Sequence, residues 1–152
     1  MQPSQYPSVV NCAPDAPAAR VLVVDDHAAT LAAIAALLDR ESPLIEVVGI
    51  ARCSDGVMRV LREAAPDVVV LDLDLGGECG LDLLPMIHGH PGVAVIILTA
   101  SDDPLDRARA LAAGAAAFVS KLSPAAELID AILAIGRKVT GIGGLSQAGG
   151  TA

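Results

Sequence analysis

The sequence has little of what would assign it to a membrane, a secreted or a nucleic-acid-binding class. No apolar run reaches the roughly 18 residues of a membrane span, and Met1–Arg20 lacks the basic start and apolar centre of a signal peptide. Cys12, Cys53 and Cys79 are odd in number and share no CxxC spacing, so neither a disulfide framework nor a zinc site is indicated. Lys and Arg total 10 against 18 Asp and Glu, a net charge of −8 that argues against binding to a phosphate backbone. We therefore expect a cytoplasmic protein with no direct contact to nucleic acid or membrane.

What the chain does have is enough apolar material for one domain. Hydrophobic residues make up 53% of the 152 positions, so a complete core can form. Residues 1–19 are rich in Pro, Ser and Ala and predict a flexible arm, whereas regular patterning over 20–138 predicts the folded domain. Residues 139–152 are rich in Gly, Ser and Thr and predict a flexible tail or the start of a linker.

Short β-branched runs alternate with helical patterns along the domain. The runs are continuously apolar, as in parallel strands covered on both faces. Together with the helical patterns between them they predict a doubly wound α/β fold, a five-stranded parallel sheet flanked by five helices. The expected strands are Val21–Asp25, Ile45–Ala51, Asp67–Asp72, Val93–Thr99 and Ala116–Ser120.

Several residues mark where the helices begin and end. Ser54 is a candidate cap, and Asp103-Pro104 and Ser123-Pro124 each place a capping residue before a proline at the first helical position. Gly114 is a plausible stop for the fourth helix. His27 is expected to begin the first helix facing solvent rather than to ligate a metal.

Polar residues follow the ends of four expected strands. The first ends in Asp25-Asp26, the third in Asp72, the fourth in Thr99, and the fifth runs into Lys121. Ligands of open parallel sheets bind beyond the carboxyl ends of the strands, so these groups are expected to converge. Clustered carboxylates need a counter-ion, and a hard cation such as Mg²⁺ prefers oxygen ligands.

These motifs together resemble the receiver domain of bacterial two-component response regulators. The matching pieces are VVDDH (23–27), VVVLDLDLGGECG (68–80), IILTA (96–100) and FVSK (118–121), which span nearly all of the expected domain. DDH and SKLSP (120–124) are closest to the NarL/LuxR-type subfamily. The resemblance implies a CheY-like fold with strand order 2-1-3-4-5.

The resemblance also implies a role for each polar residue. Asp72 would accept a phosphoryl group from a histidine kinase or phosphotransfer protein, with Thr99 binding that group and Lys121 pairing with the acceptor. Thr99 and Phe118 would form the switch that alters partner binding or dimerisation. The implied Mg²⁺ ligands are Asp25, Asp26, Asp72 and the backbone carbonyl of Asp74.

The chain departs from the family pattern after the acceptor and after the lysine. Gly76 and Gly77 stand where a proline is common, which predicts a more flexible loop. Leu122 follows the lysine in place of a proline that is often in a cis bond, so the isomer of this peptide bond stays open. Asp74 adds negative charge where phosphate must arrive.

Three other functions compete with a self-contained receiver. The chain could be the receiver fragment of a NarL/LuxR-type DNA-binding transcriptional regulator, because the 14 residues after Lys138 are too few for a helix-turn-helix unit. A haloacid-dehalogenase-type phosphatase shares the DxD pattern of Asp72-Leu73-Asp74, but that family places its acidic metal pair after the lysine, where only Asp130 remains. An adaptor without phosphorylation is disfavoured by the complete acid, Thr and Lys set.

Overall fold

The computed structural model describes residues 17–136, which form a five-stranded parallel sheet. The strand order is β2-β1-β3-β6-β7, which is 2-1-3-4-5 among the sheet's own strands, so the expected topology is confirmed. The strands are β1 (Ala19–Val24), β2 (Ile45–Ala51), β3 (Val68–Leu71), β6 (Ala94–Thr99) and β7 (Ala117–Ser120).

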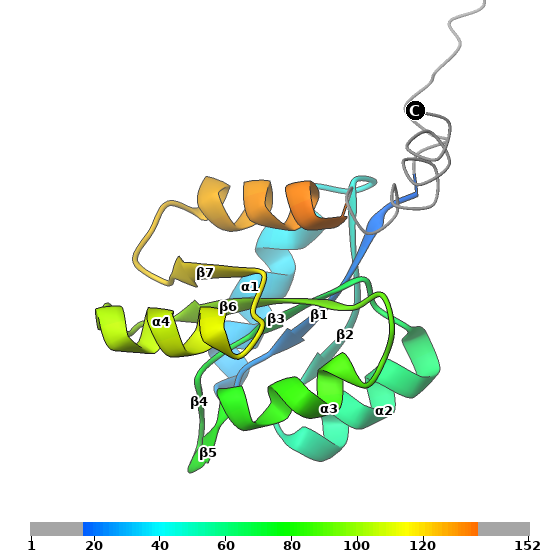
Figure 1. Ribbon diagram of the computed structural model, residues 1–152. Coiled ribbons are helices and arrows are strands. Elements are labelled where there is room, and N and C mark those ends of the chain that lie inside the picture. The colour runs from blue at the N-terminus through cyan, green and yellow to red at the C-terminus, as the bar shows by residue number, and fades with distance from the viewer. Residues whose placement is uncertain (1–16, 137–152) are drawn as a thin grey trace, which may run out of the picture.

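Helices cover both faces of this sheet (Figure 1). A 3-10 turn at Gly80–Leu83 leads into the short α3. The helices are α1 (Ala28–Asp39), α2 (Ser54–Ala64), α3 (Leu84–His88), α4 (Pro104–Ala112) and residues 125–136. Within the described residues no helix has the length and apolarity needed to cross a membrane.

Alternation along the strands divides the buried side chains into two cores. In β1, Leu22 and Val24 join the core under α2, α3 and α4, whereas Val21 and Val23 join the core under α1 and residues 125–136. All four side chains are at most 1% exposed. Burial on both faces explains why these strands are continuous apolar runs.

The boundaries of β1, β3, β6 and β7 differ from the expected ones by one or two residues. β2 spans the expected residues, and β1 begins at Ala19, which is 6% exposed and therefore belongs to the domain rather than to the expected arm. Asp25 and Asp72 lie just outside β1 and β3, because each polar side chain follows the last paired residue. Residues 1–16 and 137–152, which contain most of the arm and the tail, are outside the described residues.

The ends of α4 follow the capping pattern that the sequence predicts. The Asp103 side chain accepts a hydrogen bond from the Leu105 N–H at 2.9 Å, and Pro104 is the first helical residue. Gly114 has φ +102° just after the helix, where left-handed backbone favours glycine. The cap of α2 is one residue earlier than expected: Cys53 is the N-cap without a side-chain hydrogen bond, and Ser54 is already helical.

The segment after Asp72 forms a short hairpin where the sequence predicts only a loop. β4 (Asp74–Leu75) pairs antiparallel with β5 (Glu78–Cys79). The two turn residues, Gly76 and Gly77, have φ +64° and +103°. Two consecutive positive φ values are the signature of tight hairpin turns, which explains the glycine pair.

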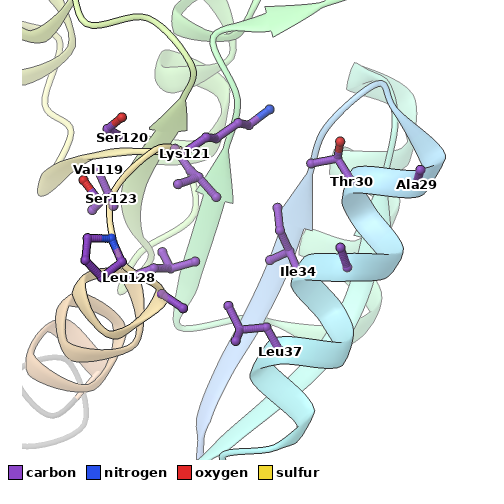
Figure 2. A pocket seen from close by; sticks show the side chains of 13 residues that line it. Ala29, Thr30, Ile34, Leu37, Val119, Ser120, Lys121, Ser123 and Leu128 are labelled. Carbon is purple, nitrogen blue, oxygen red and sulfur yellow. The ribbon is translucent and has the colours of Figure 1, made fainter.

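An apolar groove of about 400 Å³ lies between α1 and the chain that follows β7. Figure 2 shows Ile34 and Leu37 of α1 on one side and Leu128 on the other. Lys121 lies at the edge of this groove, with its ammonium pointing away from Leu37 and Leu128. The groove therefore adjoins the polar site without being part of it.

Candidate acidic site at the strand ends

Two buried carboxylates share one ammonium group at the carboxyl edge of the sheet. Lys121 Nζ donates to Asp25 Oδ2 at 2.7 Å and to Asp72 Oδ2 at 2.8 Å. Asp25 is 1% and Asp72 5% exposed. Because buried charges are costly unless they are paired, this three-residue cluster is a built feature of the fold.

The two carboxylates differ in their acidity. Burial raises the pKa of Asp72 above its ordinary value, and the hydrogen bond from Lys121 offsets only part of that rise. Burial also acts to raise the pKa of Asp25, but hydrogen bonds from Lys121 and from the His27 N–H outweigh it, so that pKa is lowered. Burial acts to lower the pKa of Lys121, but its two carboxylate partners outweigh it and raise that pKa. Asp72 is therefore the more basic of the two carboxylates.

Asp26 has a buried oxygen that accepts no well-aligned hydrogen bond, although the His27 ring nitrogen lies close to it. Its Oδ1 is buried and accepts no hydrogen bond among the described residues. The His27 ring, 67% exposed, lies beside it with Nδ1 2.8 Å from Asp26 Oδ1 and 3.3 Å from Asp25 Oδ1. His27 precedes α1 and faces solvent as expected, but its ring also contacts the acidic pair, which the sequence does not indicate.

The donor set fits a hard divalent cation. Ligand atoms of Asp25, Asp26 and His27 all lie within 4.8 Å of one another. Asp72 Oδ1 accepts the Asp74 N–H at 3.3 Å, which brings the acceptor and the Asp74 backbone together. Buried carboxylate oxygens, one of them without a donor, are the ligands that Mg²⁺ prefers.

Thr99 begins a chain of hydrogen bonds that leads into α4. Its side chain is 4% exposed, and Oγ1 accepts the Ser101 N–H at 3.2 Å. The Ser101 hydroxyl donates to Asp106 Oδ2 at 2.5 Å, which fastens the β6–α4 loop to the first turn of α4. Ser101 therefore connects the Thr99 side chain to the first turn of α4.

One open cavity of about 620 Å³ brings most of the expected site residues together. Asp72, Asp74, Thr99 and Lys121 all line it. Arg109 lines it as well, and the sequence gives no signal for this residue, because only the packing of α4 places its cation there. The cavity is therefore lined by the expected acceptor and by two cationic side chains, Lys121 and Arg109.

Phe118 lies away from that cavity. It is half-buried against the core under α2, α3 and α4, and it lines a separate cavity of about 280 Å³ with Ser101 and Ser120. The Arg107 guanidinium lies 6.0 Å from the centre of its ring. Phe118 therefore does not line the cavity that contains Asp72. Ser101 lines both that cavity and the one that Phe118 lines.

The peptide bond after Lys121 is trans. Among the described residues the one cis peptide bond is Ser42–Pro43. The isomer of the bond between Lys121 and Leu122, which the sequence leaves open, is therefore trans. Leu122 itself is 82% exposed. Lys121 therefore reaches both carboxylates without the cis bond that the family often uses.

Comparison with known proteins agrees with this geometry. The family model of the response regulator receiver domain matches residues 21–133. Response regulator GacA of Pseudomonas aeruginosa is 33% identical over 115 residues, 74% of this chain and 53% of that protein. The chain thus spans about half the length of the curated relatives it matches.

Two solved structures share the fold. A two-component response regulator of the LuxR family from Aurantimonas sp. SI85-9A1 is 35% identical, with a TM-score of 0.72 over 78% of this chain and 85% of that one. The receiver domain of the putative response regulator NarL from Mycobacterium tuberculosis is 28% identical, with a TM-score of 0.73 over 80% of this chain and 98% of that one. The extent of the family match settles the choice between a receiver and a haloacid-dehalogenase-type phosphatase. The chain belongs to the response regulator receiver domain family, whose members act in two-component signal transduction.

Proposed function

We propose that Asp72 accepts a phosphoryl group from a histidine kinase or phosphotransfer protein. The observation that carries this proposal is the buried carboxylate of Asp72, which Lys121 holds at the acceptor cavity by a hydrogen bond. Receiver domains are phosphoacceptors, and their usual cation is Mg²⁺. We extend both phosphate acceptance and Mg²⁺ binding to this chain, with Asp72 as the acceptor.

The proposed metal ligands are Asp25, Asp26, Asp72 and the backbone carbonyl of Asp74, with His27 at the rim. A bound Mg²⁺ would neutralise negative charge on the carboxylates and on the incoming phosphoryl oxygens. Lys121 supplies the second positive charge through its bonds to Asp25 and Asp72. These charges remove the repulsion between a carboxylate and an anionic donor.

The transfer is a single exchange of bonds at phosphorus. A carboxylate oxygen of Asp72 attacks the phosphorus, forming a P–O bond while the P–N bond to the donor histidine breaks. The bonding pair stays on the imidazole nitrogen, and the product is an acyl phosphate on Asp72. Lys121 then pairs with the phosphoryl group, and Thr99 donates its hydroxyl hydrogen to one of its oxygens.

Thr99 and Phe118 are the proposed switch. When the Thr99 hydroxyl turns toward the phosphoryl group, the Ser101 N–H loses its acceptor, and the β6–α4 loop that Ser101 holds can move. Phe118 lines the cavity beside that loop and would follow it. The surface near α4 and β7 would then select partners or a second copy of the chain.

The wider setting is proposed from the relatives. The chain acts as a phosphoacceptor protein rather than as an enzyme on separate substrates. A specific alternative is the receiver part of a NarL/LuxR-type regulator, because response regulators of that type are among the similar structures and the chain spans about half the length of its curated relatives. In either form we place it in the cytoplasm, where response regulators ordinarily act.

Small phosphodonors or beryllium fluoride with Mg²⁺ test the proposed acceptor. The wild type should gain one phosphoryl group or its mimic, measured by intact mass or by fluorine resonance. Asp72→Asn should gain none, and Asp74→Asn, the matched control two residues away, should still be modified. Modification of Asp72→Asn, or loss of modification in Asp74→Asn alone, would contradict the assignment.

A further inference from the structure

Arg52 binds the backbone of the acidic pair from outside the site. It lies between β2 and α2, 26 residues from Asp26 along the chain. Its Nε and Nη2 both donate to the Asp26 carbonyl oxygen, at 3.0 and 2.8 Å. A forked pair of donors fixes the direction of a carbonyl more strongly than a single donor does.

The carbonyl that Arg52 holds belongs to a peptide unit that is held at its other end as well. The same peptide unit carries the His27 N–H, which donates to Asp25 Oδ1 at 2.9 Å. The Leu31 N–H donates to the carbonyl of His27, so the Asp26 carbonyl lies just before α1. Arg52 and Asp25 therefore set the plane of one peptide from both sides.

The Asp26 carboxylate lies in a confined position beside this peptide unit. Its Oδ2 lies against Gly76 of the hairpin, where an added Cβ would come within 3.1 Å. Its Oδ1 is the buried oxygen that accepts no well-aligned hydrogen bond and lies beside the His27 ring. Rotation of the Asp26–His27 peptide would break the hydrogen bond from the His27 N–H to Asp25 Oδ1 and would free the backbone that carries the Asp26 side chain.

We propose that Arg52 is a positioning residue for the divalent cation site. The proposal rests on the proposed function, because the cation that it concerns is the one Asp25 and Asp26 would hold. Arg52 acts through the peptide between Asp26 and His27 and not by contact with the metal. Arginine is required at this position because a lysine ammonium offers no planar fork for one carbonyl oxygen.

The charge of Arg52, considered without its positioning role, predicts that its removal raises the affinity for the cation. Arg52 is a cation near a cluster of acids, so removal of its charge should strengthen cation binding by simple electrostatics. Loss of the hydrogen bonds that position the Asp26–His27 peptide should instead weaken cation binding. The sign of the change in affinity therefore separates the two explanations.

The test is a titration with Mg²⁺ alone at fixed ionic strength, followed by calorimetry or by amide chemical shifts. We expect the dissociation constants of Arg52→Ala and Arg52→Lys to rise about tenfold, the lower end of losses on removal of groups that orient metal ligands. Arg59→Ala, an exposed arginine of α2, is the matched control for charge and should bind like the wild type or slightly tighter. The His27 amide resonance should shift in both Arg52 variants, while melting without Mg²⁺ stays close to that of the wild type.

Three results would overturn the role of Arg52. Unchanged or tighter binding in Arg52→Ala would overturn it, as would wild-type affinity in Arg52→Lys. In either case binding by the wild type leaves the proposed function intact. Absence of Mg²⁺ binding by the wild type would overturn the proposed function together with the role of Arg52.

Discussion

Gly80 lies directly against the main chain of Asp72. A Cβ built on Gly80 would overlap the carbonyl oxygen of Asp72, and the Gly80 N–H donates to the Leu73 carbonyl at 2.7 Å. The hairpin therefore folds back onto the residue that we propose as acceptor, and only glycine permits that approach.

Gly80→Ala should be strongly destabilising, because the atom that it meets is backbone and cannot move aside. We expect a loss of about 3 kcal/mol or more in the free energy of unfolding, measured by urea titration. Gly77→Ala is the control: its φ of +103° strains an alanine, but no atom lies within 4 Å, so about 1 kcal/mol is expected. Equal losses in both variants would mean that the contact with Asp72 carries no cost.

In the absence of Mg²⁺, replacing Asp72 or Asp25 by the neutral asparagine should change the free energy of unfolding in opposite directions. The raised pKa of Asp72 means that its ionised form is less favourable in the folded than in the unfolded chain, so Asp72→Asn should stabilise by about 1 kcal/mol. The lowered pKa of Asp25 means the reverse, so Asp25→Asn should cost about 2 kcal/mol. Thermal melting resolves both, at roughly 4 °C for each kcal/mol. Shifts of the same sign would refute this account of the two carboxylates.

Mg²⁺ should raise the melting temperature of the wild type through binding to the folded state. At a concentration ten times the dissociation constant the stabilisation is about 1.4 kcal/mol. Asp26→Ala removes the buried oxygen that lacks a donor, so its melting temperature should not respond. An equal rise in the melting temperature of the wild type and of Asp26→Ala would mean that Mg²⁺ binds at a site without Asp26.

Thr99→Ala should still accept a phosphoryl group but should lose the response at a distance. With beryllium fluoride and Mg²⁺, amide shift changes in the wild type should extend over residues 103–135, because Thr99 and Ser101 connect the acceptor cavity to α4. In Thr99→Ala the changes should stay near Asp72. The same far-reaching changes in both proteins would exclude coupling through Thr99.

The parallel sheet could be predicted from the sequence because each strand is a separate apolar run. Ile45–Ala51 matches β2 at both ends, and the acids that follow β1 and β3 signalled the edge where the site lies. The hairpin could not be predicted in the same way, because strands of two residues carry no periodicity. Gly76-Gly77 was its one available signal.

The contacts of Arg52 and His27 show where sequence reasoning reaches its limit. Nothing in the spacing reveals that Arg52 meets a backbone carbonyl 26 residues away. The His27 ring was correctly expected to face solvent, but its approach to Asp26 depends on how the chain enters α1. Contacts with backbone atoms leave no pattern of residue types, so only the folded chain displays them.

The reach of Lys121 across the sheet affects the order in which the site can form during synthesis. Lys121 follows β7 and is 96 residues from Asp25, and both β6 and β3 lie between β7 and β1. Asp25 and Asp72 therefore leave the ribosome well before their shared counter-ion. Until β7 docks, the nascent chain must keep these two acids hydrated, so β1 and β3 cannot bury their carboxyl ends. The cluster of Asp25, Asp72 and Lys121 is thus completed only after β7 has docked.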